Sequence, residues 1–269
     1  MSLPPPAPDR TALVTGASSG IGREIARQLA ARGHGVTLVA RREEALRALA
    51  DEIGGTVRAE VIVADLGRRR SRRAIAEQLE RRALKVEILV NNAGFSTTGP
   101  VAGSDPEREV ALVRTDVEAV VDLCSTFVPG MVRRGRGAVL NVASTSAFQP
   151  LPGQAAYAAA KAFVLSYTQA LAGEVRRAGV TVTALCPGPV RTGFAEVAGF
   201  TDGEAEGALP KIMWEPVEAV AAAALTGLER GRLVVVPGAA NRLGAVGGHL
   251  TPRRLLLPIA ARVHPALRR

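Results

Sequence analysis

The stretch "TALVTGASSGIG", residues 11–22, joins an apolar, β-branched run to a glycine-rich turn and the start of a helix. The run is typical of a buried strand, and the helical pattern that follows ends at Gly33. Glycines at 16, 20 and 22 permit a tight turn and let the backbone approach a pyrophosphate. Since glycine-rich turns are common, the interpretation as a phosphate loop depends on its position between a strand and a helix.

The rest of the chain repeats this alternation. We expect strands at 35–41, 56–66, 85–94, 137–144, 179–188 and 232–238, with amphipathic helices between them. One helix begins at "SDPEREV" and runs to about Arg134. Continuously apolar strands indicate a parallel sheet covered on both faces. The sequence therefore predicts a single-domain α/β protein: a doubly wound parallel sheet (Rossmann fold) in three α/β/α layers, with its crevice at the carboxyl ends of the strands.

Composition limits the class of protein. The chain is 47% hydrophobic and 3% aromatic, which favours an aliphatic core. Two cysteines in apolar contexts, no span-length apolar run and no hydrophobic signal core favour a reducing, cytoplasmic location. We expect a poorly ordered, proline-rich tail at 1–9, the Rossmann domain at 10–240 and a basic, apolar extension at 241–269.

The charge is +9, and nearly all of it is arginine. These arginines are scattered over helix surfaces without interleaved aromatics, so we expect no nucleic-acid partner. The histidines, His34, His249 and His264, have no ligand spacing, so no metal site is expected.

The second strand ends in "VARR", where an acidic residue would bind a ribose hydroxyl pair. Arg41 and Arg42 can instead bind a 2′-phosphate through charge-assisted hydrogen bonds. The alternative is that they simply begin an exposed helix, "RREE". We predict NADP(H) in preference to NAD(H), with Arg41 as the more favoured contact.

In "AAYAAAKAFVLSY", residues 155–167, Tyr157 and Lys161 are four positions apart and therefore share one helix face. The alternative is a packed ring beside a lysine that extends to solvent. Together with "TGASSGIG", Asp65, "NNAG" (91–94), Ser144 and "PGPVRT" (187–192), the pair decides the interpretation. In this order and spacing, the chain resembles the single-domain short-chain dehydrogenase/reductase family over roughly residues 10–237.

The resemblance implies hydride transfer between a nicotinamide cofactor and a carbonyl/alcohol pair, in a homodimer or homotetramer. It implies diphosphate contacts from Gly16, Ser18, Ser19, Gly20, Ile21 and Gly22. It implies adenine and adenosine contacts from Asp65, Leu66, Asn91, Ala93 and Gly94. It implies nicotinamide contacts from Tyr157, Lys161, Pro187, Gly188, Val190 and Thr192.

The resemblance also implies catalytic roles: Tyr157 as general acid or base, Ser144 orienting the carbonyl, and Lys161 holding the nicotinamide ribose. Ser146 is a second candidate for the serine role, although the spacing to Tyr157 selects Ser144. Lowering a phenol pKa by about three units requires ~4 kcal/mol. One ammonium at ~4 Å supplies ~4 kcal/mol at an effective dielectric constant of 20.

Asp116 departs from the pattern, because the family usually has an asparagine there that helps hold a water in a proton relay. An ionised aspartate cannot donate a hydrogen bond, and its charge opposes the effect of Lys161 on Tyr157. We therefore expect Asp116 to alter the rate rather than the class of reaction.

Two segments leave alternatives open. Phe194, Phe200, Met213 and Trp214 suggest an apolar substrate pocket or ordinary packing. The extension 241–269 suggests a cap over the cleft, a dimer interface, or contact with an anionic membrane surface. The predicted function is an NADP(H)-dependent oxidoreductase acting on an apolar carbonyl or alcohol. The alternatives are a catalytically weak NADP(H)-binding sensor or interaction protein, and a basic membrane or nucleic-acid adaptor.

Overall fold

The computed structural model describes residues 3–194, 210–263 and 267. Its strands form one parallel sheet in the order β3-β2-β1-β4-β5-β6-β7, which confirms the doubly wound fold. The strands are β1 (Arg10–Thr15), β2 (Val36–Ala40), β3 (Ala59–Val63), β4 (Lys85–Asn91), β5 (Gly137–Val142), β6 (Val180–Leu185) and β7 (Val234–Val235). The direction of winding changes between β1 and β4, so the crevice is expected at their carboxyl ends.

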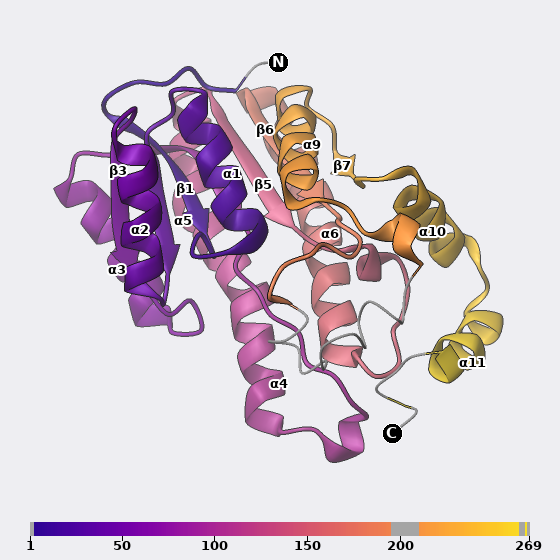
Figure 1. Ribbon diagram of the computed structural model, residues 1–269. Helices are drawn as coiled ribbons and strands as arrows, with labels where there is room; N and C mark the ends of the chain where they lie inside the picture. The colour runs from indigo at the N-terminus through magenta and orange to yellow at the C-terminus, as the bar shows by residue number, and fades with distance from the viewer. Residues whose placement is uncertain (1–2, 195–209, 264–266, 268–269) are drawn as a thin grey trace.

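Helices cover both faces of the sheet, as Figure 1 shows. One apolar core lies under α1 (Gly20–Ala31), α2 (Glu43–Gly54) and α9 (Val217–Glu229). A second core lies under α3 (Arg69–Arg81), α5 (Ala119–Arg133) and α6 (Ala155–Val175). These cores are almost wholly aliphatic, as the composition predicts.

The helix expected up to about Arg134 is built in three parts. Asp105 caps α4 (Pro106–Val113) by accepting a hydrogen bond from the Glu107 amide at 3.0 Å. A π-helical turn, Arg114–Glu118, then leads directly into α5. Such turns insert one extra residue into a helix and often occur at functional sites. Here the turn contains Asp116, which is buried.

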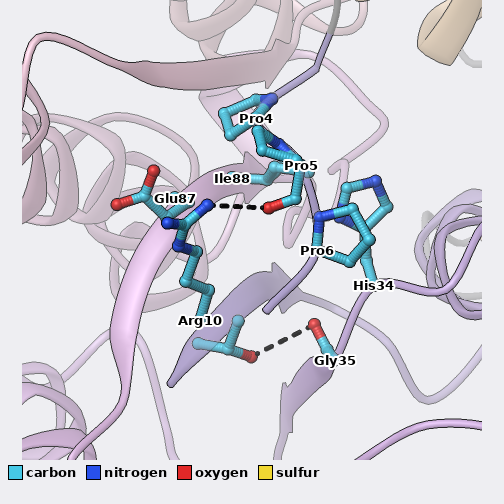
Figure 2. A pocket seen from close by; sticks show the side chains of 9 residues that line it. Pro4, Pro5, Pro6, Arg10, His34, Gly35, Glu87 and Ile88 are labelled. Atoms are coloured by element: carbon cyan, nitrogen blue, oxygen red, sulfur yellow. Dashed lines mark hydrogen bonds between the residues drawn. The ribbon is translucent and has the colours of Figure 1, made fainter. Parts of the chain in front are cut away.

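The N-terminal segment lies against the amino ends of the strands, opposite the crevice (Figure 2). Arg10 donates a hydrogen bond to the Pro5 carbonyl at 3.0 Å, and Pro4 is buried. The cavity between this segment and His34 measures about 10 Å³, which is room for no more than about one water. Residues 3–9 therefore close the bottom of the sheet rather than form a ligand site.

The C-terminal segment forms α10 (Ala239–Leu250) and α11 (Arg253–Val263). The expected boundary between residues 240 and 241 falls inside α10, since this helix begins at Ala239. Asn241, just after that boundary, is fully buried. In Figure 1, α10 and α11 lie beyond the β7 side of the sheet. Among the described residues, no helix is long and apolar enough to span a membrane.

Candidate active site

The glycine-rich loop is fixed to the end of β4 by a threonine and an asparagine. The Thr15 hydroxyl accepts hydrogen bonds from the amides of Asn92 and Ala93 at 2.9 and 3.0 Å, and donates to the Val90 carbonyl at 3.1 Å. The Asn92 side-chain amide donates to the Thr15 carbonyl at 2.9 Å. These bonds hold the loop and the start of "NNAG" together above the switch point of the sheet.

The geometry of this loop fits a bound dinucleotide diphosphate. Gly16 and Gly20 have positive φ angles of 66° and 55°, where side chains are strained. A Cβ on Gly22 would lie 2.3 Å from the side-chain amide nitrogen of Asn92 and 2.6 Å from the Gly16 carbonyl oxygen. The N-cap residue of α1, Ser19, makes no side-chain bond to the first turn. The bare loop and the uncapped amides can therefore meet an anion directly.

The two arginines after β2 occupy different positions. Arg42 donates from Nη2 to the hydroxyls of Ser18 and Ser19 at 3.1 and 2.8 Å, so its guanidinium lies over the glycine-rich loop. Arg41 is exposed. The geometry thus favours Arg42 over Arg41 as the contact for a 2′-phosphate, the reverse of the ranking from the sequence.

Tyr157, Lys161 and Ser144 lie together at the carboxyl end of β5. Tyr157 and Lys161 are both buried on one face of α6, and the Lys161 Nζ lies 5.6 Å from the centre of the tyrosine ring. Ser144 caps the short helix η3 (Thr145–Phe148), and its hydroxyl accepts the Ser146 amide at 3.1 Å. Ser146 thus contributes its backbone amide here, while a hydrogen bond from Ser144 acts to lower the pKa of Tyr157.

Asp116 forms a direct ion pair with Lys161. The Lys161 Nζ lies 3.0 Å from Asp116 Oδ2 and donates to the Val142 carbonyl at 3.1 Å. The other carboxylate oxygen accepts the Phe95 amide at 3.0 Å. A Cβ at Gly94 would come within 2.6 Å of Asp116 Oδ2, so glycine leaves room for the pair.

Burial and charge act against each other at this pair. Burial lowers the pKa of Lys161. The charges of Asp116 and Tyr157 raise it, and together they outweigh burial, so the net shift of this pKa is upward. Burial raises the pKa of Tyr157; Lys161 and Ser144 oppose that shift, and Asp116 adds to it. The lysine is therefore held as an ammonium, and part of its effect on the tyrosine is cancelled by the carboxylate behind it.

The segment after β6 forms the other wall of the site. The Pro187 carbonyl accepts the Thr145 amide at 2.9 Å, and Val190 forms a parallel bridge with Glu215. Thr192 closes over the phosphate loop, because a Cβ on Gly20 would lie 3.1 Å from its methyl group.

Aromatic residues near this wall differ in position. The ring of Phe194 lies 5.8 Å from the Tyr157 ring, between their centres. Phe200 lies outside the described residues. Met213 ends the short helix η5 (Lys211–Met213), and Trp214 follows it. Among the described members of the expected apolar set, Phe194 has a ring contact with Tyr157.

Three further predicted residues are engaged in local structure. Asp65 accepts the Gly67 amide at 3.0 Å, and the Leu66 carbonyl accepts a bond from the buried Arg72 at 2.7 Å. The Asn91 side chain donates to Asn141 Oδ1 at 2.9 Å and lies inside the sheet. For Asn91, only the backbone lies at the strand end.

Three residues that support the site, Thr15, Asn92 and Asn241, were not predicted from the sequence. Asn241 of α10 donates to the Met213 and Pro237 carbonyls at 2.9 and 3.1 Å. A Cβ on Gly188 would lie 2.2 Å from its Oδ1, so Asn241 supports the wall after β6. Thr15 and Asn92 flank motif glycines and were open to prediction. Asn241 carried no signal, because its contacts with Met213 and Gly188 join segments that are distant in the sequence.

Comparison with known proteins agrees with this geometry. Residues 10–200 match the short chain dehydrogenase family. A short chain dehydrogenase of Pseudocercospora fijiensis is 36% identical over 204 residues, which cover 71% of this chain and 65% of that protein. Sulfoacetaldehyde reductase 2 of Chromohalobacter salexigens is 34% identical over 199 residues, covering 73% of this chain and 79% of that protein.

A solved structure is similar over nearly the whole chain. The short-chain dehydrogenase from Sphingobium yanoikuyae in complex with NADPH superposes with a TM-score of 0.79 at 35% identity, covering 93% of this chain and 95% of that one. The chain belongs to the short-chain dehydrogenase/reductase family, and it is an oxidoreductase of that class.

Proposed function

We propose that this protein is an NADP(H)-dependent oxidoreductase that interconverts a carbonyl and an alcohol, with Tyr157 as general acid and base. The observation that carries the proposal is the convergence of Ser144, Tyr157 and Lys161 at the carboxyl end of β5. The segment after β6 connects them to the glycine-rich loop, because Phe194 contacts Tyr157 and Thr192 packs near Gly20. The reductase of Chromohalobacter salexigens and the NADPH complex from Sphingobium yanoikuyae support the same class of reaction.

The proton chemistry follows from the positions of three side chains. In reduction, the Tyr157 hydroxyl donates its proton to the carbonyl oxygen as charge develops there. The Ser144 hydroxyl lies beside the phenol and can donate a hydrogen bond to the same oxygen. Lys161, held as an ammonium by Asp116, stabilises the phenolate that remains. When bound, the nicotinamide nucleotide supplies or accepts the hydride.

The choice of NADP(H) rests on Arg42. Its guanidinium already lies 2.8 Å from the Ser19 hydroxyl, at the edge of the loop that fits the diphosphate. A 2′-phosphate there would accept paired, charge-assisted hydrogen bonds from the planar guanidinium. The Sphingobium yanoikuyae protein, which binds NADPH, supports this choice.

The decisive experiment is Tyr157→Phe, assayed as carbonyl-dependent oxidation of NADPH over a panel of aldehydes and ketones. The variant keeps the ring but removes the only proton that the phenol can donate. We expect the wild type to turn over and the variant to lose about 10²- to 10⁴-fold in kcat, the usual contribution of a positioned acid.

NADPH binding by Tyr157→Phe, followed by nicotinamide fluorescence, is the control. Binding that is unchanged while turnover is lost assigns the proton transfer to Tyr157. A wild type that binds NADPH but reduces no carbonyl would instead favour the sensor, the rival that the Asp116–Lys161 pair supports.

A further inference from the structure

Helix α10 contacts two walls of the candidate active site, although it follows the last strand of the sheet. It packs against η3, the short helix that Ser144 caps, and against η5, which leads into the strand bridge with the segment after β6. These two walls are also joined directly, because the Thr145 amide donates to the Pro187 carbonyl at 2.9 Å. The contacts of α10 therefore decide whether the two walls are held at one end or at both.

The first turn of α10 is fixed to the wall after β6. The fully buried Asn241 side chain donates to the Met213 carbonyl at 2.9 Å. On the N-cap residue, Gly238, a Cβ would lie 2.0 Å from Glu215 Oε1, so this carboxylate lies directly against the start of the helix. A negative charge at a helix N-terminus is stabilising. Since Glu215 also forms the bridge with Val190, α10 begins on the segment that the family resemblance assigns to the nicotinamide.

The last turn of α10 lies against η3. A Cβ on Gly248 would lie 2.4 Å from Gln149 Oε1 and 3.4 Å from Gln149 Cβ, so glycine lets the residue after η3 pack closely on the helix. The rings of Phe148 and His249 meet edge to face, with 6.4 Å between their centres. Arg253, at the start of α11, donates to the Gly248 carbonyl at 2.8 Å and to the Phe148 carbonyl at 3.3 Å. One guanidinium thus joins the end of α10 to the end of η3.

The position of η3 determines where the Ser144 hydroxyl lies. This hydroxyl accepts the Ser146 amide at 3.1 Å, and the Ser144 carbonyl accepts the Ala147 amide at 3.0 Å. A shift of η3 would therefore move the hydroxyl relative to the Tyr157 phenol. Because a misplacement of about 1 Å can cost about 10²-fold in rate, the contacts that hold η3 matter for catalysis.

We propose that α10 positions Ser144 for carbonyl reduction, because it holds η3 against the wall after β6 and so fixes the serine hydroxyl beside Tyr157. Gly248 and Arg253 are the positioning residues. Both act through η3, since their contacts are with Gln149 and with the Phe148 carbonyl. The proposal rests on the proposed function, in which the Ser144 hydroxyl donates a hydrogen bond to the substrate oxygen.

The first test inserts a side chain between α10 and η3. Gly248→Leu places it against Gln149, and Gly247→Leu is the matched control, because a Cβ on Gly247 meets no atom within 4 Å. We expect Gly248→Leu to lower kcat for NADPH-dependent carbonyl reduction at least tenfold. Its Kd for NADPH should stay within twofold of the wild type, because Thr15 and Asn92 hold the glycine-rich loop independently of α10. Gly247→Leu should match the wild type in both quantities.

The second test removes contacts without adding volume. Arg253→Ala deletes both hydrogen bonds of the guanidinium, and Arg254→Ala is the control on the same exposed turn. We expect a lower kcat in Arg253→Ala alone, with partial recovery in Arg253→Lys, which keeps a donor. Hydrogen exchange at the Ser146 and Ala147 amides should be faster in Arg253→Ala than in its control, because these amides bond to Ser144.

The outcomes separate this proposal from the proposed function. An active wild type with unchanged kcat in both Gly248→Leu and Arg253→Ala would overturn the positioning role and leave the proposed function intact. A loss of kcat that Gly247→Leu and Arg254→Ala share, or that an equal loss of NADPH binding accompanies, would also overturn it, since either result indicates a general effect on folding. A wild type that reduces no carbonyl would overturn the proposed function and, with it, the role of α10 in positioning Ser144.

Discussion

At the scale of single residues, the Asp116–Lys161 ion pair distinguishes this site from a site that has an asparagine at the position of Asp116. The carboxylate lies 3.0 Å from the lysine Nζ and is almost fully buried, so both charges lack water. Such a pair is strongly coupled: removing one partner leaves the other charge buried without compensation. The pair therefore fixes the position of Lys161 while it weakens the field that Tyr157 experiences.

Asp116→Asn is expected to shift the pH dependence of alcohol oxidation. Oxidation needs Tyr157 as phenolate, and Asp116 contributes to raising the pKa of Tyr157. Removing the negative charge lowers that pKa, so the rising limb of kcat/KM should move to lower pH by roughly one unit, or ~1.4 kcal/mol. The pH profile of alcohol oxidation by wild type and variant measures the shift.

Asp122→Asn is the control, because that carboxylate pairs with Arg72 on the α3 side of α5. Its profile should match the wild type. A limb that stays in place, or moves to higher pH, in Asp116→Asn would contradict the pairing argument. Asp116→Asn should also lower the free energy of unfolding by about 3 kcal/mol, since Lys161 loses its buried countercharge.

At the scale of elements, the phosphate loop and the start of α1 pack directly against "NNAG". Gly22→Ala would place a Cβ 2.6 Å from the Gly16 carbonyl oxygen, which is backbone and cannot swing away. We expect a loss of about 1–3 kcal/mol in the free energy of unfolding. NADPH binding should weaken as well, because the loop must open. Urea denaturation and fluorescence titration measure the two effects.

Gly173→Ala in α6 is the matched substitution, since a Cβ there meets no atom within 4 Å. Alanine is the better helix former by about 0.8–1.0 kcal/mol, so this variant should be as stable as the wild type or more so. Equal stability of the two alanine variants would refute the close approach at Gly22.

The sequence predicted the elements better than the contacts between them. Short, continuously apolar runs identify the strands, because the strands of a parallel sheet are buried on both faces. Most of the expected strands continue past the carboxyl ends of the observed ones, and some also begin too early, as with 56–66 against Ala59–Val63, since apolar residues continue into the loops. The π turn at Arg114–Glu118 and the support from Asn241 depend on tertiary packing, which periodicity does not report.

At the scale of the whole molecule, cofactor binding and folding are linked, because a ligand that binds only the folded chain stabilises all of it. At a concentration of 100 Kd the gain is ~2.7 kcal/mol. For a chain of this size, each kcal/mol raises Tm by about 2–4 °C. We therefore expect NADPH to raise Tm by about 5–10 °C, and NADH at the same concentration to raise it less.

Arg42→Ala should remove the difference between the two cofactors, since its guanidinium lies over Ser18 and Ser19. Arg41→Ala serves as the neighbouring control and should keep most of the difference. Thermal unfolding with each cofactor checks both variants. A preference that disappears in Arg41→Ala and persists in Arg42→Ala would restore the ranking from the sequence.

The bond between Thr15 and the Val90 carbonyl spans 75 positions of the chain. Strand β1 lies in the middle of the sheet, yet one of its two neighbours, β4, is synthesised only after three further helices. Until β4 emerges, the growing chain exposes an unpaired strand edge beside an apolar face, which favours aggregation. Such distant pairing also slows folding. The pairing that holds the phosphate loop in place therefore also fixes how late in synthesis this strand edge can be covered.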